Sequence, residues 1–108
     1  MDVTQGSIDA GTLRDVLGRD ESVTVVDVRK REEHERGSVP GAVNYDAYER
    51  LNAGEERAME GLEVPAGGRV VTVCNRGRAA SAAAEQLRRR GHDAVHLEGG
   101  MDAWRSFS

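Results

Sequence analysis

Sulfur and aromatic side chains are scarce in this sequence, which has one cysteine, Cys74, and 4% aromatic residues among 108. One thiol cannot form an internal disulfide, and it excludes a multi-cysteine zinc site. The three histidines do not have the spacing of metal ligands either. We therefore expect no disulfide framework and no bound metal, and a single cysteine fits the reducing cytoplasm.

Long apolar runs are also missing. No stretch approaches the roughly 20 apolar residues that a membrane-spanning helix needs. Residues 1–12 are polar and lack the basic start and apolar block of a secretory signal. These absences predict a cytoplasmic protein with no membrane partner.

Positive charge is in deficit, because the net charge is −4 and Lys30 is the only lysine. Such a protein has no overall field that attracts DNA or RNA. What is present suits a soluble folded protein, with 38% hydrophobic and 31% charged residues. Because apolar runs recur along the whole chain, we expect residues 1–108 to form a single folded domain. The negative net charge leads us to expect no nucleic-acid partner.

Short β-branched or apolar runs alternate with helical patterns along the chain. The predicted strands are 23–28, 42–44, 69–73 and 94–97. The predicted helices are 9–18, 30–36, a polar helix within 46–63, the segment from the Cys74 loop to about Arg90, and 101–106. This alternation is typical of an α/β protein whose mostly parallel sheet is covered by helices on both faces.

Residues typical of helix ends support these helices. Asp9 is expected to cap the first helix and Gly18 to end it, while Gly91 is expected to follow the last turn of the long helix. The run 88–90 is all arginine. We interpret this run as a solvated helix end, with docking of an acidic partner as the alternative. Trp104 is interpreted as a packing anchor for the final helix.

The strongest chemical signal lies between strand 69–73 and the helix after it. Cys74 stands at the carboxyl end of that strand, where ligands of open α/β sheets bind. The loop that follows can aim backbone N–H groups and a helix N-terminus at the sulfur, and Arg76 and Arg78 add positive charge. These groups favour a thiolate, the nucleophilic form of cysteine. The alternative is that Cys74 is an inert, buried core residue.

Residue types argue against two other kinds of active site. A cysteine phosphatase needs an arginine six positions after its cysteine, and Ala80 stands there. Asp27 and Arg29, at the end of strand 23–28, are interpreted as forming a structural ion pair or turn hydrogen bonds rather than as catalytic groups. The cysteine loop therefore remains the candidate site.

Three segments in order resemble the signatures of the rhodanese-like domain family. The first consists of 25–29, 32–34 and 37–44. The second is Cys-Asn-Arg-Gly-Arg at 74–78 with the alanine-rich helix, and the third is 97–104. The resemblance covers nearly the whole chain. It implies a rhodanese-like α/β fold with about five parallel strands and helices on both faces.

The resemblance implies sulfur transfer. In that family the loop cysteine takes a sulfane sulfur from a donor such as thiosulfate or a persulfide, and passes it to a thiol or cyanide. Carried onto this chain, Cys74 is the nucleophile and persulfide carrier, and Arg76 and Arg78 would attract an anionic donor. The residues whose amides would cradle the persulfide are Asn75, Arg76, Gly77, Arg78 and Ala79. The chemistry needs no metal or organic cofactor, and a sulfur-accepting protein is a further partner to consider.

The loop departs from the family pattern at two positions. Family members often carry arginine at the fifth position after the cysteine, followed by serine, and here Ala79 and Ala80 stand there. Arg78 lies one position earlier. Two alternatives to an enzyme acting on thiosulfate therefore stay open, namely a persulfide carrier for a dedicated partner and a non-catalytic binding or regulatory module. The presence of Cys74 favours the enzyme over the module.

Overall fold

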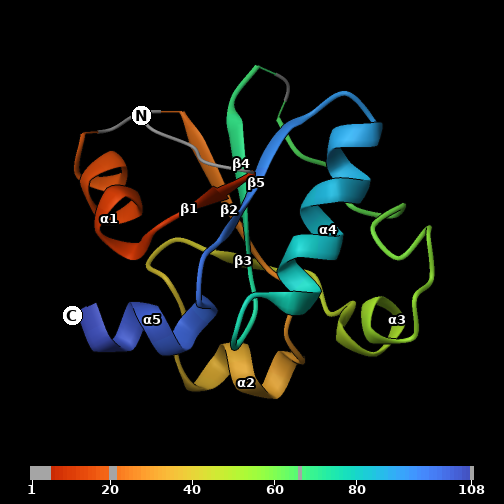
Figure 1. Ribbon diagram of the computed structural model, residues 1–108, viewed down its shortest axis with the longest axis horizontal. Coiled ribbons are helices and arrows are strands. Elements are labelled where there is room, and N and C mark those ends of the chain that lie inside the picture. Colours follow the sequence, from red (N-terminus) through yellow and green to blue (C-terminus); the bar gives the residue numbers. More distant parts are fainter. Residues whose placement is uncertain (1–5, 20–21, 66, 108) are drawn as a thin grey trace.

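The computed structural model describes residues 6–19, 22–65 and 67–107, and its centre is a five-stranded parallel sheet (Figure 1). The strand order is β1-β5-β4-β2-β3, and every neighbouring pair is parallel. The strands are β1 (Ser7–Ile8), β2 (Val23–Asp27), β3 (Val43–Asn44), β4 (Arg69–Val73) and β5 (Asp93–Leu97). The predicted parallel α/β sheet is confirmed. The predicted strands do not include β1, an edge strand of two residues that pairs with β5.

Helices cover both faces of the sheet, as the alternation predicts. They are α1 (Ala10–Gly18), α2 (Arg31–Arg36), α3 (Tyr48–Asn52), α4 (Arg78–Arg89) and α5 (Gly100–Phe107). Figure 1 shows α1 and α5 on one side of the strands, α3 and α4 on the other, and α2 below their carboxyl ends. No helix in the described ranges is long and apolar enough to cross a membrane.

The polar helix expected within 46–63 is much shorter than predicted. It ends at Asn52, and Gly54 follows with a positive φ of 79°. Residues 56–61 form turns, in which Ala58 and Met59 are fully buried against α4. The segment is held by tertiary contacts, among them the Met59 amide donating to Gln86 Oε1 at 3.1 Å. Such contacts leave no helical period in the sequence.

The two faces of the sheet have separate cores. On the α4 side, the alanine stripe of that helix packs against β2 and β4, and Ala80, Ala83, Ala84 and Leu87 have no exposed surface. On the other side, Leu13 of α1 and Met101 of α5 pack against β4 and β5. Trp104 is partly buried on this second core, which confirms its interpretation as a packing residue.

The helix ends agree with the sequence at all three predicted positions. Asp9 caps α1, because its Oδ1 accepts the Thr12 amide at 2.7 Å. Gly91 follows α4 with a positive φ of 94°. The expectation that Gly18 ends α1 is confirmed, because Gly18 is its last residue. The amide of Arg19 closes the helix by donating to the Val16 carbonyl at 3.2 Å.

The arginine run at the end of α4 is exposed, yet two of its guanidinium groups hold neighbouring backbone. Arg88 donates to the Ala94 carbonyl at 2.9 Å. Arg90 donates to the carbonyls of Met59 and Leu62 at 2.7 and 3.0 Å. Arg89 instead pairs with Glu85 on the same helix. The run therefore ties α4 to β5 and to the turns after α3.

Candidate functional site

The register of the sheet brings the ends of three strands together. Asp27 of β2 stands opposite Val73 of β4 and Asn44 of β3. The residues that follow β2 and β4 therefore meet at one edge of the sheet, above α2 in Figure 1. Cys74 is the first residue after β4 and has 2% exposed surface.

Two backbone amides point at the sulfur of Cys74. Sγ accepts the N–H of Gly77 at 3.0 Å and that of Ala80 at 3.3 Å. Gly77 belongs to the loop expected to cradle the sulfur, but Ala80 lies one residue beyond it. The first-turn amides of a helix have no partner within the helix, and α4 begins at Arg78. That rule could have identified Ala80 once the start of the helix was known.

Gly77 is required by the backbone of the loop. Its φ is +111°, in a region that side chains disfavour, and it is the N-cap residue of α4. A Cβ there would lie 3.5 Å from the amide nitrogen of Gly99. The glycine therefore lets the chain turn from the cysteine into the helix beside the β5–α5 turn.

The N-terminus of α5 holds the cysteine loop through two backbone hydrogen bonds. The amide of Met101 donates to the Cys74 carbonyl at 2.8 Å, and that of Asp102 donates to the Asn75 carbonyl at 3.1 Å. Gly100 has a φ of +59°, and a Cβ there would lie only 2.4 Å from the Cys74 carbonyl oxygen. The glycine pair at the start of α5 thus permits a close approach to the site.

Gly100→Ala should distort this contact and destabilise the fold. Gly54→Ala is the matched control, since Gly54 also has a positive φ, but a Cβ there would meet no atom of the described residues within 4 Å. Backbone strain alone should cost about 1–2 kcal/mol in the control. Gly100→Ala should cost about 1–3 kcal/mol more, because the Cys74 backbone must also move. Urea unfolding measures both costs, and equal losses would contradict the proposed close contact.

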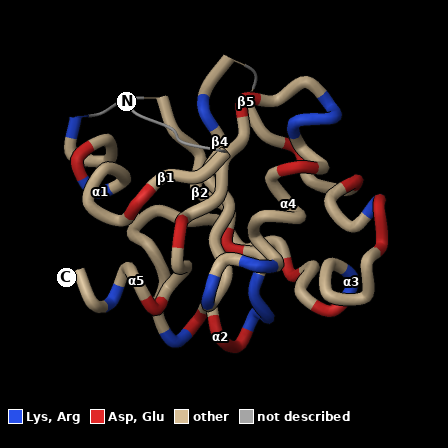
Figure 2. Tube along the Cα trace, viewed as in Figure 1, with Lys and Arg blue, Asp and Glu red and all other residues tan. Residues whose placement is uncertain are grey.

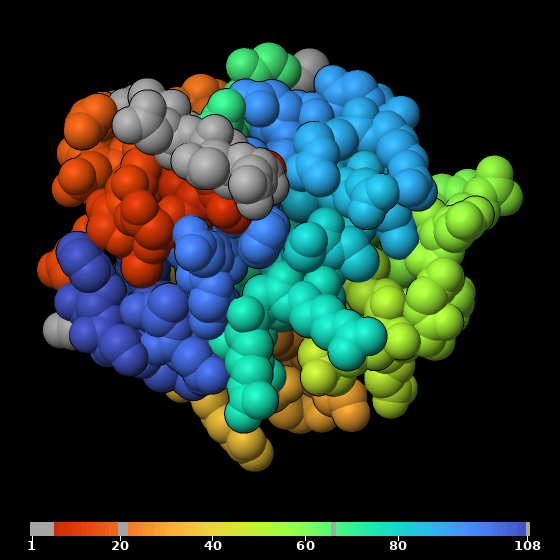
Figure 3. All heavy atoms as spheres, in the orientation of Figure 1, coloured from red at the N-terminus to blue at the C-terminus, as the bar shows by residue number. Residues whose placement is uncertain are grey.

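A pocket of about 460 Å³ opens beside Cys74. Its lining residues are Tyr48, Asn52, Cys74, Asn75, Arg76, Arg78 and Ala79. In Figure 3 the loop after β4, in teal, reaches the surface between α5 in blue and α3 in green. Sequence reasoning missed Tyr48 and Asn52, because only the tertiary fold carries α3 to the cysteine. We call this hollow the Cys74 pocket.

The positions predicted to bind substrate differ in their exposure. Arg76 has 89% of its side chain exposed, with a loose ion pair to Asp102 at 3.6 Å. The side chain of Arg78 is exposed as well, and it has no hydrogen bond or ion pair within the ranges that the structure describes. Ala79 is only 3% exposed because it packs in the core on the α4 side of the sheet. It also lines the Cys74 pocket. The two guanidinium groups are thus the cationic part of the Cys74 pocket.

A buried ion pair supports the site from β2. Arg29 donates from Nε and Nη2 to Asp27 at 3.0 and 2.8 Å, and the two residues are 1% and 0% exposed. Ser38 and His34 also contact Asp27 Oδ2, at 2.8 and 3.0 Å. Burial alone would raise the pKa of Asp27, but the hydrogen bonds from Arg29, His34 and Ser38 outweigh it and lower that pKa. The interpretation as a structural ion pair is confirmed.

Asn75 connects this ion pair to the cysteine loop. Its Nδ2 donates to Glu33 at 2.9 Å, and its Oδ1 accepts Arg29 Nη1 at 3.5 Å. The Asn75 side chain therefore reaches toward α2. Within the described ranges, no group of three or more histidine, cysteine or acidic side chains could hold a metal ion.

These features define a parallel α/β protein with a thiol at a strand end, held by the first amides of a helix. The family model for the Rhodanese-like domain matches residues 9–107, and the chain belongs to this family. Membership supports sulfurtransferase chemistry at the level of the family, and Cys74 is compatible with it.

Solved structures of other members agree with the fold. A rhodanese-related protein from Thermoplasma volcanium is 26% identical, with a TM-score of 0.74 and coverage of 94% of this chain and 92% of that one. A rhodanese-like domain protein from Staphylococcus aureus is 30% identical, with a TM-score of 0.70 and coverage of 93% and 91%. A rhodanese homolog from Thermus thermophilus is 28% identical, with a TM-score of 0.63 and coverage of 90% and 98%.

Proposed function

We propose that this protein is a sulfurtransferase that carries a sulfane sulfur as a persulfide on Cys74. The observation that carries the proposal is the position of Sγ, which accepts two backbone N–H groups at the edge of a pocket lined by two arginines. N–H dipoles at a helix N-terminus stabilise negative charge on sulfur. The same charge is needed to attack a sulfur donor.

The reaction has two displacement steps. With thiosulfate, the Cys74 thiolate attacks the outer sulfur and forms a new S–S bond, while the S–S bond of thiosulfate breaks and sulfite leaves with the electron pair. A thiol or cyanide then attacks the outer sulfur of the persulfide, and the Cys74 thiolate leaves. The two steps balance without an external oxidant, a metal or an organic cofactor. A free nucleophilic thiol fits a reducing compartment, and we propose the cytoplasm.

The intact mass of the reduced protein tests this proposal after incubation with thiosulfate and, separately, with polysulfide. A gain of one sulfur atom that cyanide or dithiothreitol removes is the expected result. A gain with polysulfide alone would favour a persulfide carrier that serves a dedicated partner. Ala79 is the observation that favours this second candidate, because it leaves the pocket without a cation at that position. No adduct from either donor would favour a binding module.

Arg78 should speed loading from anionic donors. Its exposed guanidinium lines the Cys74 pocket, and no acidic residue lines that pocket within the described ranges. Arg78→Gln should slow loading by thiosulfate about 3- to 10-fold at low salt, with a smaller loss at high salt. The rate of mass gain measures the effect. Arg57→Gln is the control, because Arg57 is 84% exposed and lies outside this pocket. An equal effect in both variants would contradict a local role.

A further inference from the structure

A second pocket lies on the other side of the cysteine loop, between α2 and α5. Its volume is about 360 Å³. The lining residues are Arg29, Glu33, Arg36, Asn75, Arg76, Asp102 and Arg105. Asn75 and Arg76 line both this hollow and the Cys74 pocket. We call it the α2–α5 pocket. A molecule seated in it would touch the same loop that carries Cys74.

Positive charge predominates in the α2–α5 pocket. Arg29 is buried and neutralised by Asp27, which leaves Arg36, Arg76 and Arg105 as its exposed cations. Two carboxylates face them. Glu33 accepts a hydrogen bond from Asn75, and Asp102 is loosely paired with Arg76 at 3.6 Å. The pocket thus has an excess of positive charge in a protein whose net charge is −4.

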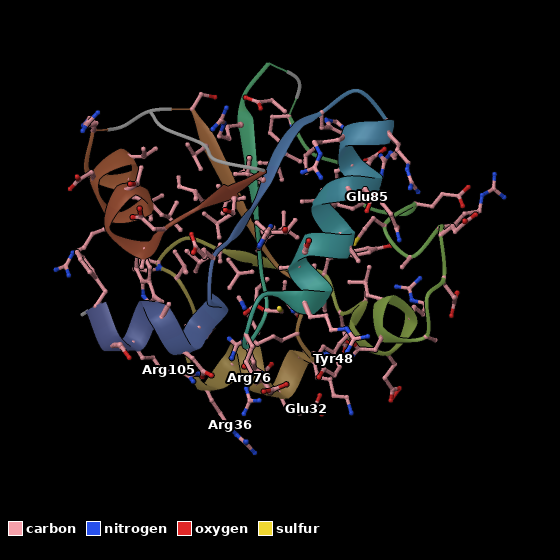
Figure 4. All side chains as sticks on the ribbon, viewed as in Figure 1. Glu32, Arg36, Tyr48, Arg76, Glu85 and Arg105 are labelled. Atoms are coloured by element: carbon pink, nitrogen blue, oxygen red, sulfur yellow. The ribbon has the colours of Figure 1, made fainter. Side chains whose placement is uncertain are left out.

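Arg36 is the cation of this pocket whose guanidinium donors are most available to a ligand. It is exposed in the last turn of α2, and its side chain has no hydrogen bond or ion pair among residues 6–19, 22–65 and 67–107. Figure 4 shows Arg36, Arg76 and Arg105 arriving from α2, the cysteine loop and α5 at the lower part of the molecule. Figure 2 shows cationic segments at the loop and at both sides of α2. Three elements therefore present guanidinium groups around one hollow.

The chemistry of this lining selects carboxylates. Guanidinium groups bind carboxylates through paired, charge-assisted hydrogen bonds, and none of the described residues that line the pocket is apolar. The volume suits one or two acidic side chains of an extended segment. The net charge of −4 argues against the long phosphate backbone of a nucleic acid. An acidic protein segment is thus the occupant that the charge favours.

We propose that the α2–α5 pocket binds an acidic segment of a protein that accepts sulfur from Cys74. This inference rests on the sulfurtransferase function proposed above. A partner held there would bring a neighbouring thiol to the Cys74 pocket across Asn75 and Arg76. Its thiolate would attack the outer sulfur of the persulfide and form a new S–S bond. The bond to Cys74 would then break, with Cys74 leaving as the thiolate.

Arg88, Arg89 and Arg90 are the competing site for an acidic partner. The guanidinium groups of Arg88 and Arg90 already donate to backbone carbonyls, and Arg89 is paired with Glu85. They also lie at the opposite end of α4 from Cys74 (Figure 1). Binding there would not bring a partner's thiol to the persulfide. The competing site therefore gives a distinct outcome in the test below.

The first part of the test measures binding to the unloaded protein. The probe is a short, end-blocked peptide of glutamates with one cysteine, and its control has glutamine in place of each glutamate. In amide NMR spectra, the acidic peptide should shift the signals of Arg36, Asn75, Arg76 and Asp102, and salt should weaken the effect. Arg36→Gln should weaken binding about threefold or more, while Arg57→Gln should not. Shifts confined to residues 88–90, or no salt-sensitive binding, would overturn the proposal.

The second part measures sulfur transfer from the loaded protein to both peptides. The acidic peptide should gain sulfur faster than the glutamine peptide, and Arg36→Gln should reduce that ratio about threefold. Loading by thiosulfate without any binding of the acidic peptide would overturn this inference alone. Peptide binding without any loading of Cys74 would overturn the proposed function, and the accepting role with it. Equal binding of a single-stranded oligonucleotide at the pocket would also overturn specificity for an acidic protein.

Discussion

Replacing Cys74 by serine should abolish sulfur loading and leave the fold nearly as stable as before. Cys74 is the only cysteine, so no other thiol in the chain can take up sulfur in its place. A serine hydroxyl stays protonated at neutral pH and is a weak nucleophile without a neighbouring base. Because it can still accept the amides of Gly77 and Ala80, the loop keeps its hydrogen bonds. Intact mass after incubation with thiosulfate or polysulfide measures the loss.

The stability of the same variant separates chemistry from folding. Cys74 is 2% exposed, and serine is similar in size, so the free energy of unfolding should change by about 1–2 kcal/mol at most. Cys74→Ala is the comparison, since it leaves both amides without the sulfur acceptor. Both variants should fail to load, and the alanine variant should be no more stable than the serine variant. A mass gain that persists in Cys74→Ser would show that sulfur binds elsewhere, and the mechanism would be wrong.

Much of the sheet can be predicted from the sequence because its central strands are buried on both faces. β2 and β4 are nearly continuous β-branched runs, and such runs are readable without tertiary information. β1 has only two residues and exists through its pairing with β5. The turns after α3 are held by Gln86 and Arg90 of α4. Segments that are held in place by contacts with residues distant in the sequence show no local hydrophobic pattern from which they could be predicted.

The candidate site divides in the same way. Cys74 and Gly77 can be recognised locally, because a strand, a cysteine, a glycine and a helix follow one another. Ala80 needs the exact start of α4, which sequence patterns place only within a few residues. Tyr48 comes from a helix that the sequence predicts poorly. Gly100 contacts the loop only because β5 and β4 are neighbours in the sheet. The nucleophile can thus be predicted from the sequence, whereas the residues that line and support its pocket can be identified only from the three-dimensional structure.

The largest loss of stability should follow from removing the guanidinium beside Asp27. Arg29→Met keeps much of the length of the side chain but leaves a carboxylate with no exposed surface and without its main partner. Breaking a buried ion pair in this way costs about 3–5 kcal/mol. Arg29 also donates to the Gly37 carbonyl at 2.6 Å, and this contact is lost as well. Urea unfolding near neutral pH measures the cost.

Arg69→Met is the matched control for this loss. Arg69 also donates from Nε and Nη2 to one carboxylate, that of Asp93, at 3.0 and 3.2 Å. The Asp93 side chain, however, is 61% exposed, so water can replace the lost partner. This variant should lose only about 1 kcal/mol or less. Similar losses in the two variants would show that burial of Asp27 does not set the cost.

The contribution of Asp27 to the pH dependence of the unfolding free energy should have opposite signs in Arg29→Met and in the natural protein. The pKa of Asp27 is lowered in the fold, so its ionised form stabilises the protein above the unfolded value of 3.8, and this stabilisation is lost as pH falls through the lowered pKa. Without the Arg29 donors, burial should dominate and raise that pKa. Protonation of Asp27 then favours the folded variant, so the deficit in its unfolding free energy relative to the natural protein should shrink as the pH falls from neutral toward 3.8. A deficit that stays constant or grows over this range would contradict an unpaired carboxylate as its cause.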